Sequence, residues 1–112
     1  MRITVGITSY NQRNLLIEAV DSVLSQSAIP FEIIIVDDAS TDDSPELIMG
    51  YASRYLGIVR PILLDQNTGP NAARNYVLDA ATGYFLTFLD GDDRWLPTKL
   101  EREMARLSAA DW

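Results

Sequence analysis

Three carboxylates lie within four residues at Asp90, Asp92 and Asp93, separated only by Gly91. They directly follow the apolar run 84–89, which has the length and aromatic content of a buried strand. Like charges at this spacing repel one another unless a cation lies among them. Hard oxygen ligands favour Mg²⁺, Mn²⁺ or Ca²⁺. The first hypothesis is therefore a divalent metal site, with a solvated turn as the simpler alternative.

A second acidic cluster covers residues 37–43. Asp37 and Asp38 end another apolar run, where a carboxylate could accept a hydrogen bond from a base N–H or a ribose hydroxyl. For Asp42 and Asp43 we favour a solvated turn leading into a helix, because Asp is common at helix starts.

Residues 69–75 have two interpretations of equal weight. Gly69 and Pro70 could merely begin a helix with Arg74 on its exposed face. Alternatively, the helix N-terminus faces an anion, and Arg74 adds a charge-assisted bond to phosphate or base.

Among the aromatic residues, Tyr10 could pack in the core or could stack on the planar ring of a ligand, whereas Trp95 is better explained as a packing anchor.

Composition limits the classes of function. The 112 residues suffice for one domain, and the net charge of −7 argues against nucleic acid as a partner. The chain has no Cys and no His, so acid–base or metal chemistry would depend on carboxylates. No apolar run is long enough to span a membrane and no signal peptide is evident, which predicts a cytoplasmic protein.

The elements that must position these residues alternate along the chain. We expect strands at 3–8, 31–36, 59–64 and 84–89, and helices from 15 to near 26, from 44 towards 55, from 69 to a stop at Gly83, and from Pro97 onward. Pro61 indicates that the third strand lies at a sheet edge. This order predicts an α/β fold, with helices on both faces of a parallel, doubly wound sheet.

In such sheets, ligands bind beyond the carboxyl ends of the strands, near a switch in strand order. A polar cluster follows each predicted strand, at residues 8–11, 37–38, 65–67 and 90–93. This coincidence is stronger evidence for a site than any one cluster.

Four segments in order resemble motifs of the family 2 glycosyltransferases, nucleotide-sugar transferases with the Rossmann-like GT-A fold. They are Thr8-Ser9-Tyr10-Asn11, the Asp-Asp-x-Ser-x-Asp turn within 32–42, the Asn-x-Gly and Ala-Arg-Asn of 67–75, and the Asp-x-Asp-Asp metal motif within 88–93. The resemblance extends over the whole chain.

The resemblance implies roles for the matching residues. Thr8 and Tyr10 would line the pocket for the nucleotide base, and Asp38 would accept a hydrogen bond from the base. Arg74 would lie near the base or the diphosphate of the nucleotide-sugar donor.

The resemblance also implies a Mn²⁺ or Mg²⁺ cofactor. Asp90 and Asp92 would approach the ribose and the metal, and either Asp92 or Asp93 would supply the main protein ligand. The metal would stabilise charge developing on the departing nucleoside diphosphate.

The family's domain continues past the metal motif with further strands, an acceptor region and a general base. We therefore expect residues 1–112 to be the N-terminal, donor-binding part, ending after the fourth strand and its helix, with the general base beyond Trp112. The acceptor would be a glycan or a lipid-linked acceptor, and the full-length enzyme could act at the inner face of the membrane. Without the rest of the domain, an apolar edge or face of the sheet would be exposed, which would favour self-association.

Other classes of function explain the motifs less well. A receiver-like Mg²⁺-binding signalling domain needs a phospho-acceptor Asp after its third strand and a Lys after its fifth, whereas the only Lys here is Lys99 in the last helix. A phosphatase would place its Asp-x-Asp motif after the first strand. A catalytically inactive nucleotide-binding module stays open, although the completeness of the motifs argues against it.

Overall fold

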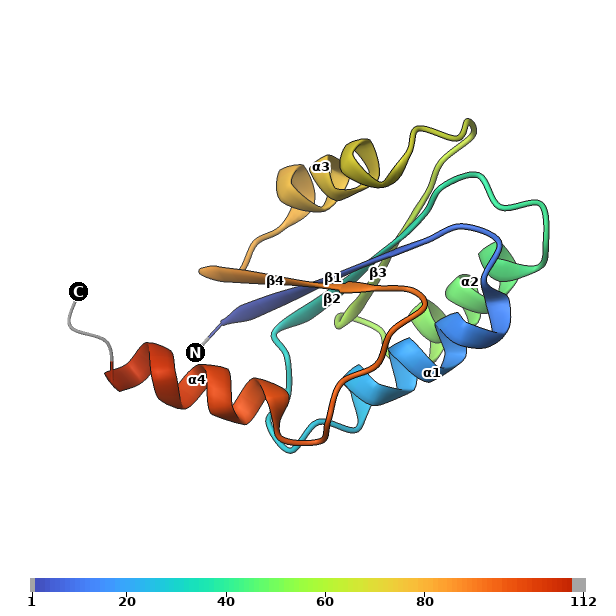
Figure 1. Cartoon of the computed structure of the whole chain (residues 1–112). Helices are drawn as coiled ribbons and strands as arrows, with labels where there is room; N and C mark the ends of the chain where they lie inside the picture. Colours follow the sequence, from blue (N-terminus) through green and yellow to red (C-terminus); the bar gives the residue numbers. More distant parts are fainter. Residues whose placement is uncertain (1, 110–112) are drawn as a thin grey trace.

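The computed structural model describes residues 2–109 and contains the predicted alternation of strands and helices. Met1 and residues 110–112, the ends of the predicted domain, lie outside the described residues. The elements are β1 (Ile3–Ser9), α1 (Arg13–Leu24), β2 (Glu32–Asp37), α2 (Ser44–Arg54), β3 (Val59–Leu63), α3 (Pro70–Ala80), β4 (Phe85–Asp90) and α4 (Lys99–Ala109) (Figure 1).

The four strands form a parallel sheet in the order β3-β2-β1-β4. The chain adds strands in one direction from β1 to β3 and then returns to place β4 on the other side of β1. Strand order therefore switches between β1 and β4. In the register, Thr8 lies opposite Asp90 and Ser9 opposite Asp37, so the polar ends of β1, β2 and β4 meet at one edge of the sheet.

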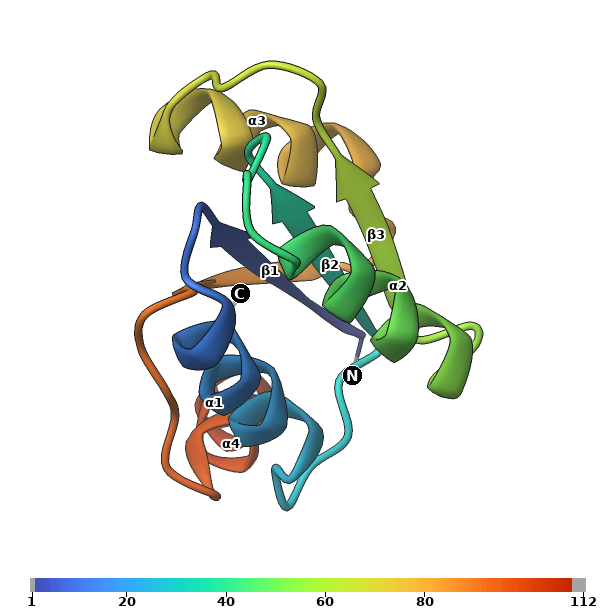
Figure 2. The ribbon, with the colours of Figure 1, turned by 90° about the vertical axis from the view of Figure 1, so that its right-hand side faces the viewer.

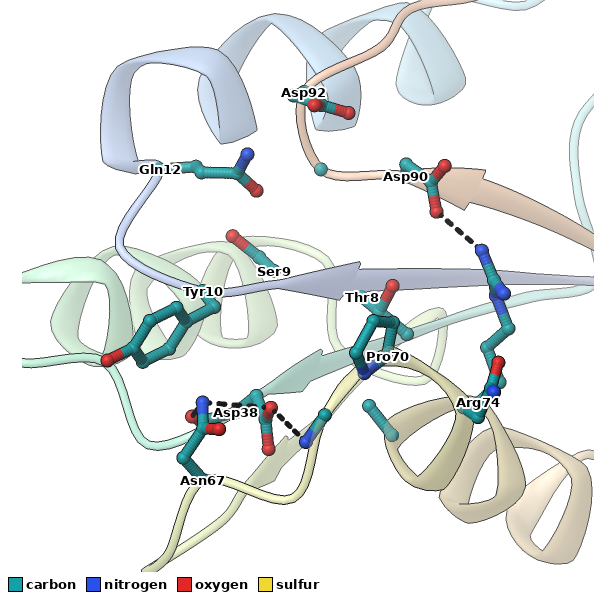
Figure 3. A pocket seen from close by; sticks show the side chains of 14 residues that line it. Thr8, Ser9, Tyr10, Gln12, Asp38, Asn67, Pro70, Arg74, Asp90 and Asp92 are labelled. Atoms are coloured by element: carbon teal, nitrogen blue, oxygen red, sulfur yellow. Dashed lines mark hydrogen bonds and ion pairs between the residues drawn. The ribbon is translucent and has the colours of Figure 1, made fainter.

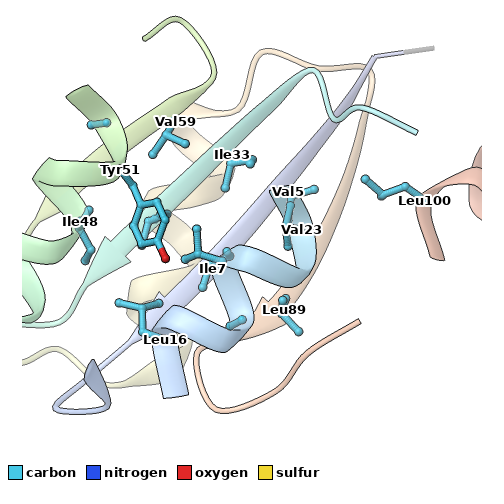
Figure 4. Packing of buried hydrophobic residues seen from close by; sticks show 14 of the residues in the cluster. Val5, Ile7, Leu16, Val23, Ile33, Ile48, Tyr51, Val59, Leu89 and Leu100 are labelled. Atoms are coloured by element: carbon cyan, nitrogen blue, oxygen red, sulfur yellow. The ribbon is translucent and has the colours of Figure 1, made fainter. Parts of the chain in front are cut away.

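Helices cover both faces of the sheet, as predicted. α1, α2 and α4 lie on one face, and α3 lies on the other (Figures 1 and 2). The larger core packs Ile7 and Ile33 of the sheet against Leu16 and Val23 of α1 (Figure 4). A smaller core joins β2 to α3 on the opposite face. Every residue of β2 is buried, which explains its almost continuous apolar sequence.

β4 differs from the buried strand that its sequence predicts. It begins at Phe85 rather than at 84, and the side chains from Phe85 to Phe88 are only half-buried. The physical reason is its position, because β4 is an outer strand of the sheet. β3 is the other outer strand, which confirms the prediction made from Pro61.

α3 ends at Ala80, earlier than the predicted stop at Gly83. The next residues leave the helix because their N–H groups have partners elsewhere. Thr82 donates to the Glu32 carboxylate at 2.6 Å, and Gly83 donates to the Thr4 hydroxyl at 3.0 Å.

One helix begins where predicted and one begins slightly later. α2 starts at Ser44, whose N–H donates to the Asp42 carboxylate at 2.9 Å. α4 begins at Lys99, after a turn at Pro97 and Thr98. None of the helices within residues 2–109 is long and apolar enough to cross a membrane.

Candidate functional site

A cleft of about 560 Å³ lies at the carboxyl ends of β1 and β4, at the switch in strand order. It is lined by Thr8, Ser9, Tyr10, Gln12, Asp38, Asn67, Gly69, Pro70, Asn71, Ala73, Arg74, Asp90, Gly91 and Asp92. Six of the predicted site residues are in this set, and the seventh, Asp93, is not. Figure 3 shows Tyr10, Asp38 and Asn67 at one end of the cleft and Arg74 with Asp90 at the other.

Asp38 is 5% exposed, and its carboxylate accepts four hydrogen bonds from the loop that precedes α3. Thr68 donates from both its N–H and its hydroxyl at 2.8 Å, Gly69 donates from its N–H at 2.9 Å, and the Asn67 amide donates at 3.1 Å. Burial by itself would raise the pKa of Asp38, but the bonds from Thr68 and Gly69 outweigh burial and hold that pKa below its ordinary value.

Four hydrogen bonds satisfy the acceptor capacity of a carboxylate. A base N–H could therefore bind Asp38 only by replacing one of these donors. In the structure, Asp38 fixes the wall of the cleft and the start of α3. Gly69 has φ of 89°, a conformation that suits glycine and lets the loop enter the helix.

The loops after β1 and β2 are joined to each other, which positions Tyr10. The Asn11 side-chain oxygen accepts from the Thr41 N–H at 2.7 Å, and the Asn11 N–H donates to the Ser40 hydroxyl at 2.9 Å. Ser40 in turn donates from its N–H and its hydroxyl to the buried Asp37. Asp37 therefore has a local structural role. Tyr10 is 44% exposed, so its ring is accessible to a ligand.

Arg74 supplies the positive charge of the cleft. Its guanidinium donates to the Asp90 carboxylate at 3.0 Å and lies over the Phe88 ring, 6.0 Å from the centroid. Both partners of this ion pair are substantially exposed. The pair can therefore open to admit a ligand at small energetic cost, because exposed ion pairs contribute little to stability. The N-terminus of α3 also lines the cleft and favours anions.

The acidic turn is more open than its sequence predicts. Asp92 lines the cleft, whereas Asp93 accepts from the Arg94 N–H at 2.8 Å and Asp90 faces Arg74. Among residues 2–109, no group of three acidic side chains is arranged to hold a metal ion. The three carboxylates therefore have different surroundings: Asp90 pairs with Arg74, Asp93 binds the neighbouring N–H, and Asp92 lies on the wall of the cleft.

The cleft still fits a Mg²⁺ or Mn²⁺ ion. These ions are commonly held by one or two carboxylates together with phosphate oxygens of the substrate, rather than by a complete protein cage. Asp90 and Asp92 provide two oxygen ligands on the wall of the same cleft (Figure 3).

Gly91 allows the turn to lie directly against β1. A Cβ at this position would be 2.8 Å from the Thr8 carbonyl oxygen, so a larger residue would push the turn away. Trp95 packs against the larger core, as predicted, and Lys99 lies over its ring.

Sequence reasoning did not assign Ser9 or Gln12 to the site. Ser9 is 4% exposed and its hydroxyl has no hydrogen-bond partner within the described part of the chain. Ser9 is the last residue of β1 and belongs to the Thr8-Ser9-Tyr10-Asn11 motif, which was the signal in the sequence that could have identified it. Nothing in the sequence around Gln12 indicated that it would line the cleft.

The sequence matches the family model for glycosyl transferase family 2 over residues 4–111. One curated relative is the succinoglycan biosynthesis protein ExoO of Rhizobium meliloti, which is 36% identical over 108 residues. The match covers 96% of this chain and 30% of ExoO. The chain spans less than a third of the first curated relatives that it matches.

Solved structures of glycosyltransferases share the fold. S. aureus TarS 1-349 in complex with UDP-GlcNAc superposes with a TM-score of 0.86 at 29% identity, covering 96% of this chain and 31% of TarS. The mannosyltransferase PcManGT of Pyrobaculum calidifontis, in complex with GDP-Man and Mn²⁺, superposes with a TM-score of 0.84 at 26% identity. That match covers 97% of this chain and 32% of PcManGT.

The likeness confirms the predicted GT-A type of α/β fold, and the sequence match extends through all four motifs. This chain belongs to glycosyl transferase family 2.

Proposed function

We propose that residues 1–112 form the donor-binding part of an inverting glycosyltransferase that uses a UDP-sugar. The observation that carries the proposal is the single cleft that joins Tyr10, Asp38, Arg74, Asp90 and Asp92 at the switch in strand order. Ligands of doubly wound sheets bind at this position. TarS has been solved with UDP and with UDP-GlcNAc, which supports a uridine nucleotide as the donor.

The two ends of the cleft suit the two ends of a nucleotide. At one end, the exposed Tyr10 ring offers a surface on which a base can stack, beside the loop that Asp38 holds. At the other end, Arg74 can bind phosphate oxygens, and the N-terminus of α3, which begins beside Asp38, also lines the cleft and favours anions. Thr8 lies between these ends, where it would contact the middle part of a bound nucleotide (Figure 3).

Asp90 and Asp92, with Asp93 as the alternative main ligand, would hold a Mn²⁺ or Mg²⁺ ion against the diphosphate. When bound, the metal would stabilise negative charge on the departing nucleoside diphosphate. PcManGT, which is solved with Mn²⁺ and GDP-Man, supports this part of the proposal. Arg74 would release Asp90 and turn to the diphosphate when the donor enters.

We infer that the general base and the binding site for a glycan or lipid-linked acceptor belong to the part of the relatives that this chain does not span. A cytoplasmic location, at the inner face of the membrane for a lipid-linked acceptor, and self-association of the isolated chain belong to the same proposal.

Calorimetry tests the donor-binding proposal. We expect UDP to bind the 112-residue chain more tightly with Mn²⁺ than without it, and more tightly than GDP or dTDP. Asp92→Asn should remove most of the gain due to Mn²⁺ and leave binding of metal-free UDP unchanged, because the lost carboxylate acts through the metal. If the gain due to Mn²⁺ is lost in Asp93→Asn rather than in Asp92→Asn, Asp93 is the main metal ligand.

Asp79→Asn is the matched control, because Asp79 is an exposed acid of α3 that does not line the cleft. It should bind UDP and Mn²⁺ as the unchanged chain does. Metal-independent binding, or full metal dependence in both Asp92→Asn and Asp93→Asn, would contradict the site assignment. Tighter binding of GDP than of UDP would contradict the choice of nucleotide.

A further inference from the structure

The segment between the acidic turn and α4 has no regular secondary structure of its own from Asp93 to Leu96. The turn that precedes it is held by β1 and β4, since the Gly91 N–H donates to the Thr8 carbonyl at 2.8 Å and the Asp93 N–H donates to the Asp90 carbonyl at 3.0 Å. The remainder of the segment, from Trp95 to α4, runs beside the C-terminal end of α1 (Figures 1 and 2).

Gln26, just after α1, binds both the end of this segment and the first turn of α4. Its side-chain nitrogen donates to the Leu96 carbonyl at 2.7 Å, and its side-chain oxygen accepts from the Leu100 N–H at 2.9 Å. The same nitrogen also donates to the Ser22 carbonyl at 2.9 Å, within the last turn of α1. Gln26 is 7% exposed, so both of its polar atoms are used in a nearly water-free position.

Two further bonds come from the same part of α1. The Trp95 N–H donates to the Ser22 hydroxyl at 3.0 Å, and the Ser27 N–H donates to the Pro97 carbonyl at 2.8 Å. The main chain is therefore fixed at Trp95, only two residues after Asp93. With β1 holding Gly91, the acidic turn is anchored on both sides.

We infer that Gln26 is a positioning residue for the Asp92-Asp93 turn. It touches neither the cleft nor a carboxylate, and acts by fixing the main chain that follows them. Groups that orient metal ligands from outside the coordination shell typically change metal affinity when they are removed. The functional part of this inference rests on the proposed function, because it assumes that the turn holds a divalent cation beside a nucleotide.

Gln26→Leu tests the inference, because Leu keeps most of the side-chain volume and removes all three hydrogen bonds. We expect the ratio of UDP affinities with and without Mn²⁺ to fall about tenfold, whereas the affinity for metal-free UDP changes little. In hydrogen exchange, the Asp93 and Trp95 amides should exchange about tenfold faster, and the Gly91 amide, which β1 holds, should not.

Tyr51→Phe is the control for a general loss of stability. It removes a partly buried side-chain bond between α2 and α1, in which the Tyr51 hydroxyl donates to the Asp21 carboxylate at 2.8 Å and no residue of the turn takes part. Its Mn²⁺ ratio and its exchange at Asp93 and Trp95 should match those of the unchanged chain. Ser22→Ala removes the bond from the Trp95 N–H together with the bond that the Ser22 hydroxyl donates to the Ala19 carbonyl inside α1. It should produce the same two effects as Gln26→Leu at a smaller size, about threefold.

If Gln26→Leu does not fold, Ser22→Ala decides. A Mn²⁺ ratio within twofold of the unchanged chain, or unchanged exchange at Asp93 and Trp95, would overturn the inference. If the unchanged chain shows no Mn²⁺-dependent nucleotide binding, the proposed function fails. Exchange at Asp93 and Trp95 then decides by itself whether Gln26 fixes the turn.

Discussion

Asp38 shows how one carboxylate can shape a binding cleft while its oxygens are already bonded to the protein. Its oxygens accept from Asn67, Thr68 and Gly69, and these bonds keep its pKa low despite burial. The family resemblance implies that this residue accepts from the base. The structure shows that the same oxygens hold the loop before α3, so a base that bound Asp38 would have to replace one of these donors.

Asp38→Asn should destabilise the chain by about 1–3 kcal/mol, because an amide nitrogen would face N–H donors that then lose a buried acceptor. UDP affinity should fall at the same time, since the wall of the cleft loosens. Urea denaturation and calorimetry measure the two effects. Asp65→Asn, at an exposed position before the same loop, is the control and should change neither quantity. Equal stability of Asp38→Asn and Asp65→Asn would contradict the structural role.

Arg74 offers a second prediction at the level of single residues. Arg74→Ala should weaken binding of UDP with Mn²⁺ by about tenfold, because a charge-assisted bond to phosphate is lost. The free energy of unfolding should change by less than about 1 kcal/mol, since the pair with Asp90 is exposed.

Arg13→Ala is a matched control, because Arg13 forms an exposed ion pair with Asp43 at 2.8 Å and does not line the cleft. Both variants should have similar stability, and only Arg74→Ala should lose affinity. A comparable loss of affinity in Arg13→Ala would point to a general charge effect.

At the scale of elements, Glu32 joins strands that lie far apart in the sequence. Its carboxylate, at the amino-terminal edge of the sheet, accepts from Thr4 of β1 at 2.8 Å, from Arg60 of β3 at 2.8 Å and from the Thr82 N–H that precedes β4. Burial by itself would raise the pKa of Glu32, but these bonds lower it from 4.5 to about 2. The edge of the sheet opposite the cleft is therefore held by one charged side chain.

This pKa predicts how stability depends on pH. The unfolded chain binds a proton at Glu32 below about pH 4.5 and the folded chain only below about pH 2, so the carboxylate's contribution is complete above pH 4.5 and is lost as the pH falls towards 2. The shift corresponds to about 3 kcal/mol. Glu32→Gln should therefore cost about 2–4 kcal/mol at pH 7 and progressively less below pH 4.5, measured by urea denaturation. Glu46→Gln, at an exposed acid of α2, should show no such pH-dependent difference.

The elements and most of the cleft were predictable because their signals are local. Strand and helix periodicity gave the order of elements, and the rule that ligands bind beyond parallel strands brought Thr8, Asp38 and Asp90 together. The half-burial of β4 was not predictable, because a strand's own sequence does not reveal whether a neighbour lies on both sides. Gln26 was missed since its partners, Leu96 and Leu100, are 70 and 74 residues away along the chain.

At the scale of the whole molecule, the charge distribution explains why a cation matters. The chain has a net charge of −7, and the cleft is lined by three acids, Asp38, Asp90 and Asp92, and by Arg74, which pairs with Asp90. A diphosphate would be repelled by the acids of the turn in the absence of metal. A bound divalent cation reverses the local potential, so metal and nucleotide should each strengthen the binding of the other.

The outer position of β4 leads to the last prediction, which concerns association of two copies. Among the described residues, β4 has a strand neighbour on one side only, and its side chains from Phe85 to Phe88 are half-buried. An edge strand presents unpaired backbone N–H and C=O groups on which a second chain can pair. Sedimentation equilibrium should therefore show concentration-dependent dimers of the 112-residue chain.

Thr87→Lys places a charge in the middle of this edge and should weaken dimerisation at least about tenfold, because lysine on an edge strand opposes pairing. Leu56→Lys is the control for non-specific hydrophobic association, since Leu56 is 82% exposed in the connection between α2 and β3. It should dimerise like the unchanged chain. Strictly monomeric behaviour of the unchanged chain at high concentration would exclude pairing through β4, and a loss of dimers in Leu56→Lys alone would move the interface to the opposite end of the sheet.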